Sequence, residues 1–521
     1  MSVNCTSCGH TNVIKKGSVL RQSVKHDRFK CKNCGNNFYL TATQQTVDPV
    51  DVFIDNNFVR DEDWVLNKKL STRFVITSAQ SNAPVNLKFL QSLKTYCKHN
   101  DAELLVIQTR YKTSNLLEDD LVNEYPKEIE EFTFENNIRL NKNLKVLGLL
   151  KVAATADNPL SGLAPISKGD SVIIGHNQLQ MMTLPVQPNE HPIIMTTTGT
   201  ISEKKYSESK QGYKAEFNHS QSAVIVELDG DSFHLRHLNF DGVGFYDFEK
   251  YYSSTGIKTP LRAIEAIVTG DEHAIFFDKE VKEATYGKDG IVDSLNPKYI
   301  VRHDVLDCYS ISHHHRNNTM TKFKKFVTGE NNMKAELDET IKFIVETTPK
   351  NSINIIVPSN HTDHLTKWLN ECEIKYEPWN SIVYHYLMYN MLQSINLNPS
   401  NTPDPFELYS AEDFEKYNTS VEFLGRRDSY KILDIEVAIH GDKGMNGSRG
   451  SRAQFAMLPS KTIVGHSHSP GIEKGCYQTG TSSTLQLEYN DGPSTWMNTH
   501  ALIYANGKRQ LVNIINGKWR A

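Results

Sequence analysis

The most informative segment for the fold of this chain is Lys461-Thr-Ile-Val-Gly-His-Ser-His468. A short apolar run that ends in polar residues predicts a buried strand with functional side chains at its carboxyl end. Four other apolar runs end in the same way. They lead to Asp271-Glu-His273, His303-Asp304-Val-Leu-Asp307, Ser359-Asn360-His361-Thr362 and His440-Gly-Asp442. One histidine at a strand end is usually an ordinary polar residue, but five such ends in one chain indicate a metal centre.

The chain on either side of these runs also has an α/β pattern. We expect strands at 74–80 and 103–109 with a helix at 85–97 between them, and short strands at 171–174, 193–197 and 223–228. Amphipathic helices are expected at 323–346 and 382–392, and Asn506-Gly507 predicts a hairpin. The sequence shows no internal repeat, and residues 74–260 show no chemistry of their own.

The composition is that of a soluble globular protein. The chain has 521 residues, 38% of them hydrophobic, with 57 basic and 61 acidic residues and a net charge of -4. A disordered, fibrous or membrane protein is therefore not expected, and no run reaches the ~20 apolar residues of a membrane span. The eight cysteines are too few for a disulfide framework, so we expect a cytoplasmic protein.

The length predicts more than one domain, because single cores rarely exceed roughly 250–300 residues. We expect a zinc ribbon at 1–40, a linker at 41–73, an α/β region of unknown role at 74–260 and a catalytic domain at 261–521. Residues 1–40 hold seven basic residues and one acidic residue, a formal charge of +6, which leaves -10 for the remainder.

Two Cys-x-x-Cys pairs near the start of the chain predict a structural zinc ion. They are Cys5 with Cys8 and Cys31 with Cys34, each followed by glycine. Four thiolates complete a tetrahedral zinc shell. The segment resembles the zinc ribbons of transposase-like and transcription proteins, which implies contact with nucleic acid. Its positive charge suits phosphate contacts, although a ribbon that only mediates subunit contacts is an alternative.

The five strand ends resemble the motifs of the calcineurin-like metallophosphoesterases, which run DxH, GDxxD, GNH, a lone His and GHxH. The likeness covers roughly residues 262–470, with His303 and Ser359 where glycine is usual, Thr362 where an acid is usual and Cys308 in place of arginine. It implies an α/β fold of the metallophosphoesterase type, an αββα sandwich, here joined to a zinc ribbon and an extra mixed α/β region.

The resemblance also implies a pair of divalent ions, with manganese as the expected metal. Asp271, His273 and His468 would bind the first ion, Asn360, His440 and His466 the second, and Asp304 would bridge them. These ligand types suit manganese, iron or zinc, and two such ions favour in-line attack on phosphorus. His361 is the implied proton donor to the leaving oxygen. Asp307 is expected to orient a ligand histidine from behind.

Two basic segments are candidates for substrate contact. His313, His315 and Arg316 follow Asp307 closely, and a solvated loop is an equally good interpretation of them. The glycine-rich stretch after His440 carries Lys443, Arg449 and Arg452, which can clamp a phosphate backbone. It lacks the pattern of a Walker loop.

These patterns favour a two-metal phosphodiesterase that cleaves DNA with the help of the ribbon. The arrangement is similar to the pre-early nucleases of T-five-type phages that degrade host DNA, which implies a phage protein acting in the bacterial cytoplasm. A phosphomonoesterase or phosphoprotein phosphatase is the alternative enzyme. A non-catalytic zinc-ribbon DNA-binding protein is the alternative from another class. A homo-oligomer is also compatible with the sequence.

Overall fold

The computed structural model describes residues 7–8, 10–21, 24–41, 71–111, 124–188, 190–400, 402–488 and 490–521. The chain divides into two compact units, Met1–Asp61 and Glu62–Ala521. Cys5 and residues 42–70 of the expected linker lie outside the described residues. Among the residues that are described, no helix is long and apolar enough to cross a membrane.

The first unit contains a three-stranded antiparallel sheet. Its strands are β1 (Val13–Arg21), β2 (Val24–Cys31) and β3 (Asn37–Thr41), with β2 in the middle. Cys31 ends β2, and the turn that follows contains Cys34 and Gly35, whose φ of 76° lies in the left-handed region that glycine adopts without strain. The second cysteine pair therefore occupies a tight turn between two strands.

The second unit is a mixed α/β structure, as the sequence predicts. Its first sheet has six strands in the order β20-β19-β18-β17-β26-β27. The neighbours from β17 to β20 are parallel, while β26 and β27 are each antiparallel to the strand before them. The strands are β17 (Ile264–Val268), β18 (Tyr299–Arg302), β19 (Ile353–Ile356), β20 (Val421–Phe423), β26 (Thr499–Tyr504) and β27 (Arg509–Asn513).

A second sheet of ten strands has the order β21-β22-β23-β25-β24-β10-β11-β9-β8-β7. Five strands come from the end of the chain: β21 (Lys431–Ile432), β22 (Ile435–Glu436), β23 (Lys461–Val464), β24 (Gly471–Glu473) and β25 (Cys476–Gln478). The other five are β7 (Asn137–Asn141), β8 (Leu144–Leu147), β9 (Ser171–Ile174), β10 (Gln180–Leu184) and β11 (Ile193–Thr197). β10 precedes the expected domain boundary at residues 260/261 and β24 follows it, yet the two strands pair. The two expected domains therefore share this sheet.

A third sheet has the order β13-β12-β4-β5-β6. It consists of β4 (Arg73–Gln80), β5 (Glu103–Thr109), β6 (Thr133–Phe134), β12 (Ser222–Asp229) and β13 (Ser232–Asn239). Helix α2 (Leu87–Asn100) packs on one of its faces, and α3 (Lys210–Phe217) precedes β12. A small antiparallel sheet, β14 (Gly244–Asp247), β15 (Lys250–Ser253) and β16 (Gly256–Lys258), follows β13.

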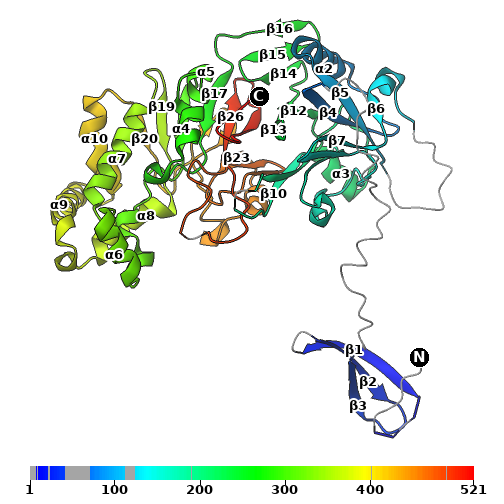
Figure 1. The fold of residues 1–521 in the computed structure, drawn as a ribbon, viewed down its shortest axis with the longest axis horizontal. Coiled ribbons are helices and arrows are strands. Elements are labelled where there is room, and N and C mark those ends of the chain that lie inside the picture. Colours follow the sequence, from blue (N-terminus) through cyan, green and yellow to red (C-terminus); the bar gives the residue numbers. More distant parts are fainter. Residues whose placement is uncertain are drawn as a thin grey trace. The chain divides into compact units, whose positions relative to one another are not determined.

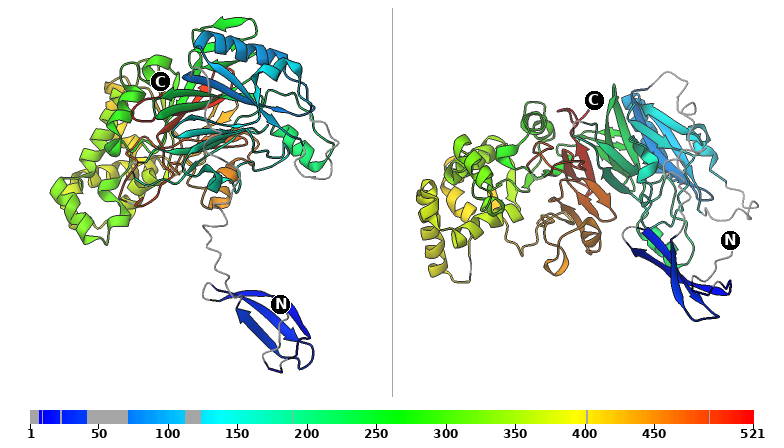
Figure 2. Two further views of the ribbon diagram at one scale, coloured as in Figure 1. Left: turned by 45° about the vertical axis from the view of Figure 1, so that its right-hand side comes forward. Right: turned by 60° about the horizontal axis from the view of Figure 1, so that its bottom comes forward.

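One hydrophobic core joins the three large sheets. It contains Val268 and Val301 of the six-stranded sheet, Ile463 of the ten-stranded sheet and Val224 of the five-stranded sheet. Helices cover the other face of the six-stranded sheet, and Figures 1 and 2 show α6 to α10 gathered at the opposite end of this unit from α2. These helices are α4 (Lys279–Tyr286), α5 (Ile291–Leu295), α6 (Thr319–Thr328), α7 (Met333–Glu346), α8 (Asn360–Glu371), α9 (Ser381–Leu397) and α10 (Pro405–Lys416).

Strand order reveals an internal repeat that the sequence did not predict. Taken in chain order, the strands from β4 to β13 correspond one to one to the strands from β17 to β27 once β20 is omitted. Each pair of neighbouring strands in one copy is parallel or antiparallel as its counterpart in the other copy is. The two copies, 71–258 and 259–521, meet where β10 pairs antiparallel with β24. We call them the first and second repeats. The interpretation that the chain lacks a repeat is wrong, because the two copies share a topology but little sequence.

Most expected elements of the second unit are present with small shifts. The strands expected at 74–80, 103–109, 171–174 and 193–197 match β4, β5, β9 and β11 within one residue. The helix expected at 323–346 is two helices, α6 and α7, because Gly329 ends α6 in a left-handed conformation with a φ of 77°. The hairpin at Asn506-Gly507 connects β26 and β27 as expected.

Candidate metal centre

The expected ligands lie where strands of the two main sheets end. Asp271 and His273 follow β17, and Asp304 follows β18, so parallel pairing of these strands brings them to one edge. Asn360 and His361 begin α8, directly after β19. His440 follows β22, and the pair His466 and His468 follows β23, the parallel neighbour of β22 in the ten-stranded sheet. The centre therefore forms between two sheets that share one core.

Four of these residues form a buried cluster around one point. The candidate ligand atoms of Asp271, His273, Asp304 and His468 all lie within 4.8 Å of one another. His468 Nε2 is 3.1 Å from Asp271 Oδ2, and 3.2 Å from His273 Nε2. His273 Nε2 is 3.9 Å from Asp304 Oδ2. Two imidazoles and two carboxylates at this spacing form a set that can hold a metal ion.

A second cluster adjoins the first. Asp271, His303 and His440 again place ligand atoms within 4.8 Å of one another, and His440 Nε2 lies 3.1 Å from Asp304 Oδ2. The ring of His466 packs against that of His440 with centroids 5.2 Å apart. Asp304 is thus close to ligands of both clusters, between His273 on one side and His440 on the other.

His303 is a residue that the sequence argument did not include among the ligands. Its Nδ1 is 3.2 Å from His440 Nδ1, and the residue is buried. The available signal was its position directly after β18, next to Asp304. The metallophosphoesterase motif has glycine at this position, so the resemblance does not predict a ligand here.

Several polar atoms at the centre are buried without a hydrogen bond. They include Asp271 Oδ1, Asp304 Oδ1, Asn360 Oδ1 and His303 Nε2, which find no hydrogen-bond partner among the described residues. A buried polar atom left unpaired costs about 1–3 kcal/mol, and such atoms are normally satisfied. The lack of hydrogen-bond partners for these oxygen and nitrogen atoms is therefore explained if the centre binds cations.

The backbone at the centre is in an unfavourable conformation for its residue types. His273, Asp304, His466 and His468 have φ values of 44°, 46°, 72° and 56°. Side-chain-bearing residues rarely adopt this left-handed region, and such strain concentrates at functional sites. Four candidate ligands share it because each lies just beyond a strand, where the chain must turn for the side chain to reach the centre.

Residues behind the ligands fix their orientation. Asp307 Oδ2 is 2.6 Å from His273 Nδ1, so His273 directs Nε2 to the cluster. His361 Nδ1 is 2.9 Å from the backbone oxygen of Asp307. Below them, the fully buried Arg302 donates from Nη1 to Glu272 Oε1 at 2.8 Å, and this ion pair lies between the strand ends that carry Asp271 and Asp304.

Electrostatics keep the carboxylates of the centre ionised. Burial acts to raise the pKa of Asp304, but the imidazoles of His440 and His361 hold this pKa well below its usual range. For His361, burial acts to lower the pKa, but Asp304 and Asp307 outweigh it and raise the pKa to about 9. Burial lowers the pKa of His468. The centre thus holds ionised carboxylates beside the neutral imidazole of His468, a combination that favours a cation.

The first repeat has the same turns but not the same ligands. Gly175-His-Asn-Gln178 follows β9 as Gly465-His-Ser-His468 follows β23, and a Thr-Gly-Thr sequence follows both β11 and β25. Thr200 Oγ1 donates to Ser78 O as Thr481 Oγ1 donates to Asp271 O, so Ser78 takes the place of Asp271.

The histidine that the two repeats share is used differently in the first one. His176 Nε2 is 3.0 Å from Ala153 O, and His176 Nδ1 accepts a hydrogen bond from the Gln178 backbone at 3.0 Å. Both ring nitrogens are therefore occupied within the fold. The chemistry of the centre belongs to the second repeat.

In the ribbon, three of the four expected zinc ligands lie together. The sulfur atoms of Cys8, Cys31 and Cys34 lie within 4.8 Å of one another, with Cys8 and Cys31 at 3.6 Å. Hydrogen bonding from the Cys34 backbone lowers the pKa of Cys31 to about 7. A thiol of lowered pKa supplies the thiolate that zinc binds. The fourth expected ligand, Cys5, is outside the described residues.

The expected substrate contacts lie in two places. His313, His315 and Arg316 line a pocket of about 830 Å³ beside α6 and α8, and Arg316 Nη1 is 3.4 Å from Glu371 Oε2. In the glycine-rich segment, Lys443 Nζ is 3.0 Å from Asp363 Oδ2 on α8, and Arg449 is exposed.

Arg426 and Arg452 complete the surroundings of the glycine-rich segment. Arg452 Nη1 donates to Ser469 O at 3.0 Å, directly after His468, so it supports the turn that carries this ligand. Arg426 was not among the residues predicted from the sequence. Its Nη1 is 2.9 Å from Asp442 Oδ1, and its Nη2 is 2.8 Å from Asp363 Oδ2. It ties the segment after His440 to α8.

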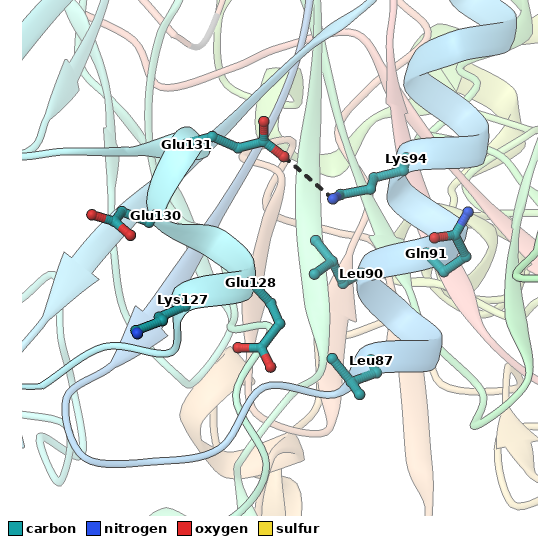
Figure 3. Close-up of a pocket in the computed structure, with 8 residues that line it drawn as sticks. All are labelled: Leu87, Leu90, Gln91, Lys94, Lys127, Glu128, Glu130 and Glu131. Atoms are coloured by element: carbon teal, nitrogen blue, oxygen red, sulfur yellow. Dashed lines mark hydrogen bonds and ion pairs between the residues drawn. The ribbon is translucent and has the colours of Figure 1, made fainter.

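A second pocket, of about 620 Å³, lies away from the centre. Figure 3 shows it between α2 and the short 3₁₀ helix Lys127–Phe132, with Lys94 Nζ 3.4 Å from Glu131 Oε1. It is lined by Leu87, Leu90, Gln91, Lys94, Lys127, Glu128, Glu130 and Glu131. Among the described residues, its glutamates form no group at metal-ligand spacing.

The chain was compared with protein families and with known proteins. No protein-family model matches it. Protein A1 of Escherichia phage T5 is 33% identical over 476 residues, which cover 88% of this chain and 84% of that protein. The chain belongs to the family of protein A1. Because the match spans both repeats, the likeness extends well beyond the metal centre and supports a phage origin for the chain.

Proposed function

We propose that this member of the protein A1 family is a two-metal phosphodiesterase that cleaves DNA. The observation that carries the proposal is the buried cluster of Asp271, His273, Asp304 and His468, with unpaired oxygens, at the ends of strands from two sheets. A metallophosphoesterase-type sandwich is the fold we propose for the second repeat. In support, its two sheets share a core and helices cover the far face of the six-stranded sheet.

The donor atoms fit two divalent ions, with manganese as the proposed metal. Asp271, His273 and His468 would hold one ion, and Asn360, His440 and His466 the other, with Asp304 between them. Carboxylate, imidazole and amide oxygen are ligands that suit such ions. When bound, the ions supply charge neutralisation at the phosphate oxygens and activate water for in-line attack. His303 lies near enough to Asp271 and His440 to compete for, or add to, the second set.

The proposed proton donor to the leaving oxygen is His361. Its Nδ1–H donates to Asp307 O at 2.9 Å, which leaves Nε2 for a substrate atom. A pKa of about 9, raised by Asp304 and Asp307 against the effect of burial, keeps this imidazole protonated at neutral pH. A donor that is charged at working pH can protonate the departing alkoxide. The carboxylate of Asp307 accepts from His273 and its backbone oxygen accepts from His361, so one residue positions both imidazoles.

DNA is the proposed substrate because a polymer benefits from a second point of attachment. The ribbon segment carries a formal +6 on 40 residues, about +4 once zinc and four thiolates are included. Lys443, Arg449 and the residues near His313 are the proposed phosphate contacts beside the centre. The setting we propose is phage-encoded degradation of host DNA in the bacterial cytoplasm. The phage relative supports the phage origin that this setting requires.

The test compares DNA and a small phosphate monoester as substrates. Purified chain is incubated with plasmid DNA, linear DNA and p-nitrophenyl phosphate, with and without Mn²⁺, beside Asp304→Ala and His361→Ala. Mn²⁺-dependent DNA cleavage that both variants lose is the expected result. Cleavage of the monoester alone would instead identify a phosphomonoesterase. Metal binding with no turnover of either substrate would identify a non-catalytic DNA-binding protein.

A further inference from the structure

A third group of histidines lies outside the proposed dinuclear set. Candidate ligand atoms of His313, His314 and His364 lie within 4.8 Å of one another. His313 and His314 belong to the short 3₁₀ helix His313–His315, and His364 lies on α8, three residues after His361. The ring centroids of His313 and His364 are 4.7 Å apart, and those of His313 and His314 are 4.0 Å apart.

Two ring nitrogens of this group are buried without a partner. His313 Nδ1 and His364 Nδ1 have almost no contact with solvent and no hydrogen bond within the described residues. An unpaired buried nitrogen costs about 1–3 kcal/mol. Two unpartnered nitrogens within one cluster of three imidazoles are explained if the cluster binds a cation.

The charge state of the group also favours a metal ion. Burial, followed by the neighbouring imidazoles of His361, His313 and His314, lowers the pKa of His364 to about 4. Burial and His314 lower the pKa of His313. Neutral imidazole is the form that coordinates metals, and at neutral pH these side chains need lose no proton to do so.

The surroundings leave room for a further ligand. His313 and His364 line the pocket of about 830 Å³ beside α6 and α8, which is also lined by Arg316, Lys322 and Lys367. Three protein nitrogens with an open position are the usual pattern of a zinc site that exchanges its fourth ligand. The cationic lining favours an anion at that position.

We propose that His313, His314 and His364 bind a divalent transition-metal ion of the zinc or cobalt type, separate from the dinuclear centre. An all-imidazole site prefers such an ion over Mn²⁺, for which oxygen ligands are better. The site lies next to His361, whose ring is 5.3 Å from that of His364. Binding at this site does not depend on DNA cleavage and can be measured in an inactive chain.

The experiment counts bound metal in the full-length chain. Wild type, His313→Ala, His364→Ala and the matched control His385→Ala are saturated with Co²⁺, passed through a desalting column and analysed for cobalt per chain. His385 is an exposed histidine on α9, outside the histidine clusters found among the described residues. We expect His313→Ala and His364→Ala each to lose one equivalent, and His385→Ala to lose none.

A second measurement separates loss of this site from damage to its neighbour. The exchange-coupled signal of a Mn²⁺ pair, read by electron paramagnetic resonance, should persist in both variants. Equal cobalt content in wild type and both variants would overturn the proposal. So would a loss confined to His364→Ala together with loss of the Mn²⁺ pair, because that result would place the effect at the dinuclear centre, whose proposed ligand Asn360 lies on the same helix.

Discussion

Replacing Asp307 by asparagine should weaken metal binding without unfolding the chain. Asp307 is buried, and His273 is the proposed ion ligand that its carboxylate contacts. The distance from Asp307 Oδ2 to His273 Nδ1 is 2.6 Å, and this bond holds the ring with Nε2 toward Asp271 and Asp304. In Asp307→Asn the amide oxygen can still accept the bond, but the negative charge that makes His273 a better ligand is lost. Partners behind metal ligands are typically worth 10–100-fold in affinity.

The expected loss is therefore about 1.4–2.7 kcal/mol of binding free energy per affected ion. Titration of the metal-free chain with Mn²⁺, followed by calorimetry, measures it directly. Asp338→Asn is the matched control, since Asp338 lies on the exposed face of α7 and pairs only with surface groups. Thermal unfolding of both variants shows whether the fold is kept.

An unchanged Mn²⁺ dissociation constant in a folded Asp307→Asn chain would refute the assignment of His273 as a ligand oriented by Asp307. A loss of the same size in Asp338→Asn would show that the effect is one of overall charge.

Three further predictions concern the support of the centre, its fold and the ribbon. Arg302→Met should lower the free energy of unfolding in urea by about 3–5 kcal/mol, because it leaves the buried carboxylate of Glu272 without its cationic partner. A change below about 1 kcal/mol would contradict a structural role for the pair. His237 is buried and its pKa falls to about 4, so the unfolded chain binds an extra proton at this residue between pH 4 and 6.5. The contribution of His237 to stability should be full above pH 6.5 and lower by about 2 kcal/mol at pH 5, and His237→Gln should reduce the pH dependence of unfolding accordingly. Cys8→Ser should release the ribbon zinc, weaken DNA binding and reduce its salt dependence, while hydrolysis of a small diester continues; loss of that hydrolysis would make the ribbon part of the catalytic fold.

Local features of this chain were predictable where the signal lies within one element. β5 and β9 have the bounds expected from their apolar runs, and polar residues at the ends of β17 and β18 meet because parallel strands end at one edge. The split of α6 from α7 at Gly329 was missed because amphipathic periodicity continues across the break.

Features that depend on distant pairing were not predictable in this way. The pairing of β10 with β24 joins residues almost 300 positions apart, and the repeat is recognised from strand order, together with a Gly-His and a Thr-Gly-Thr sequence that both copies contain. His303 was passed over because the family motif has glycine there. The sequence does not predict that His364 lies beside His313 and His314, because this contact depends on how α8 packs.

The most direct test of the central claim is anomalous scattering from crystals of the chain soaked in Mn²⁺. Two manganese peaks about 3.5–4 Å apart are expected. One should contact Asp271, His273 and His468, the other Asn360, His440 and His466, and Asp304 should contact both. A single peak, or manganese bound elsewhere with these side chains unliganded, would contradict a two-metal centre.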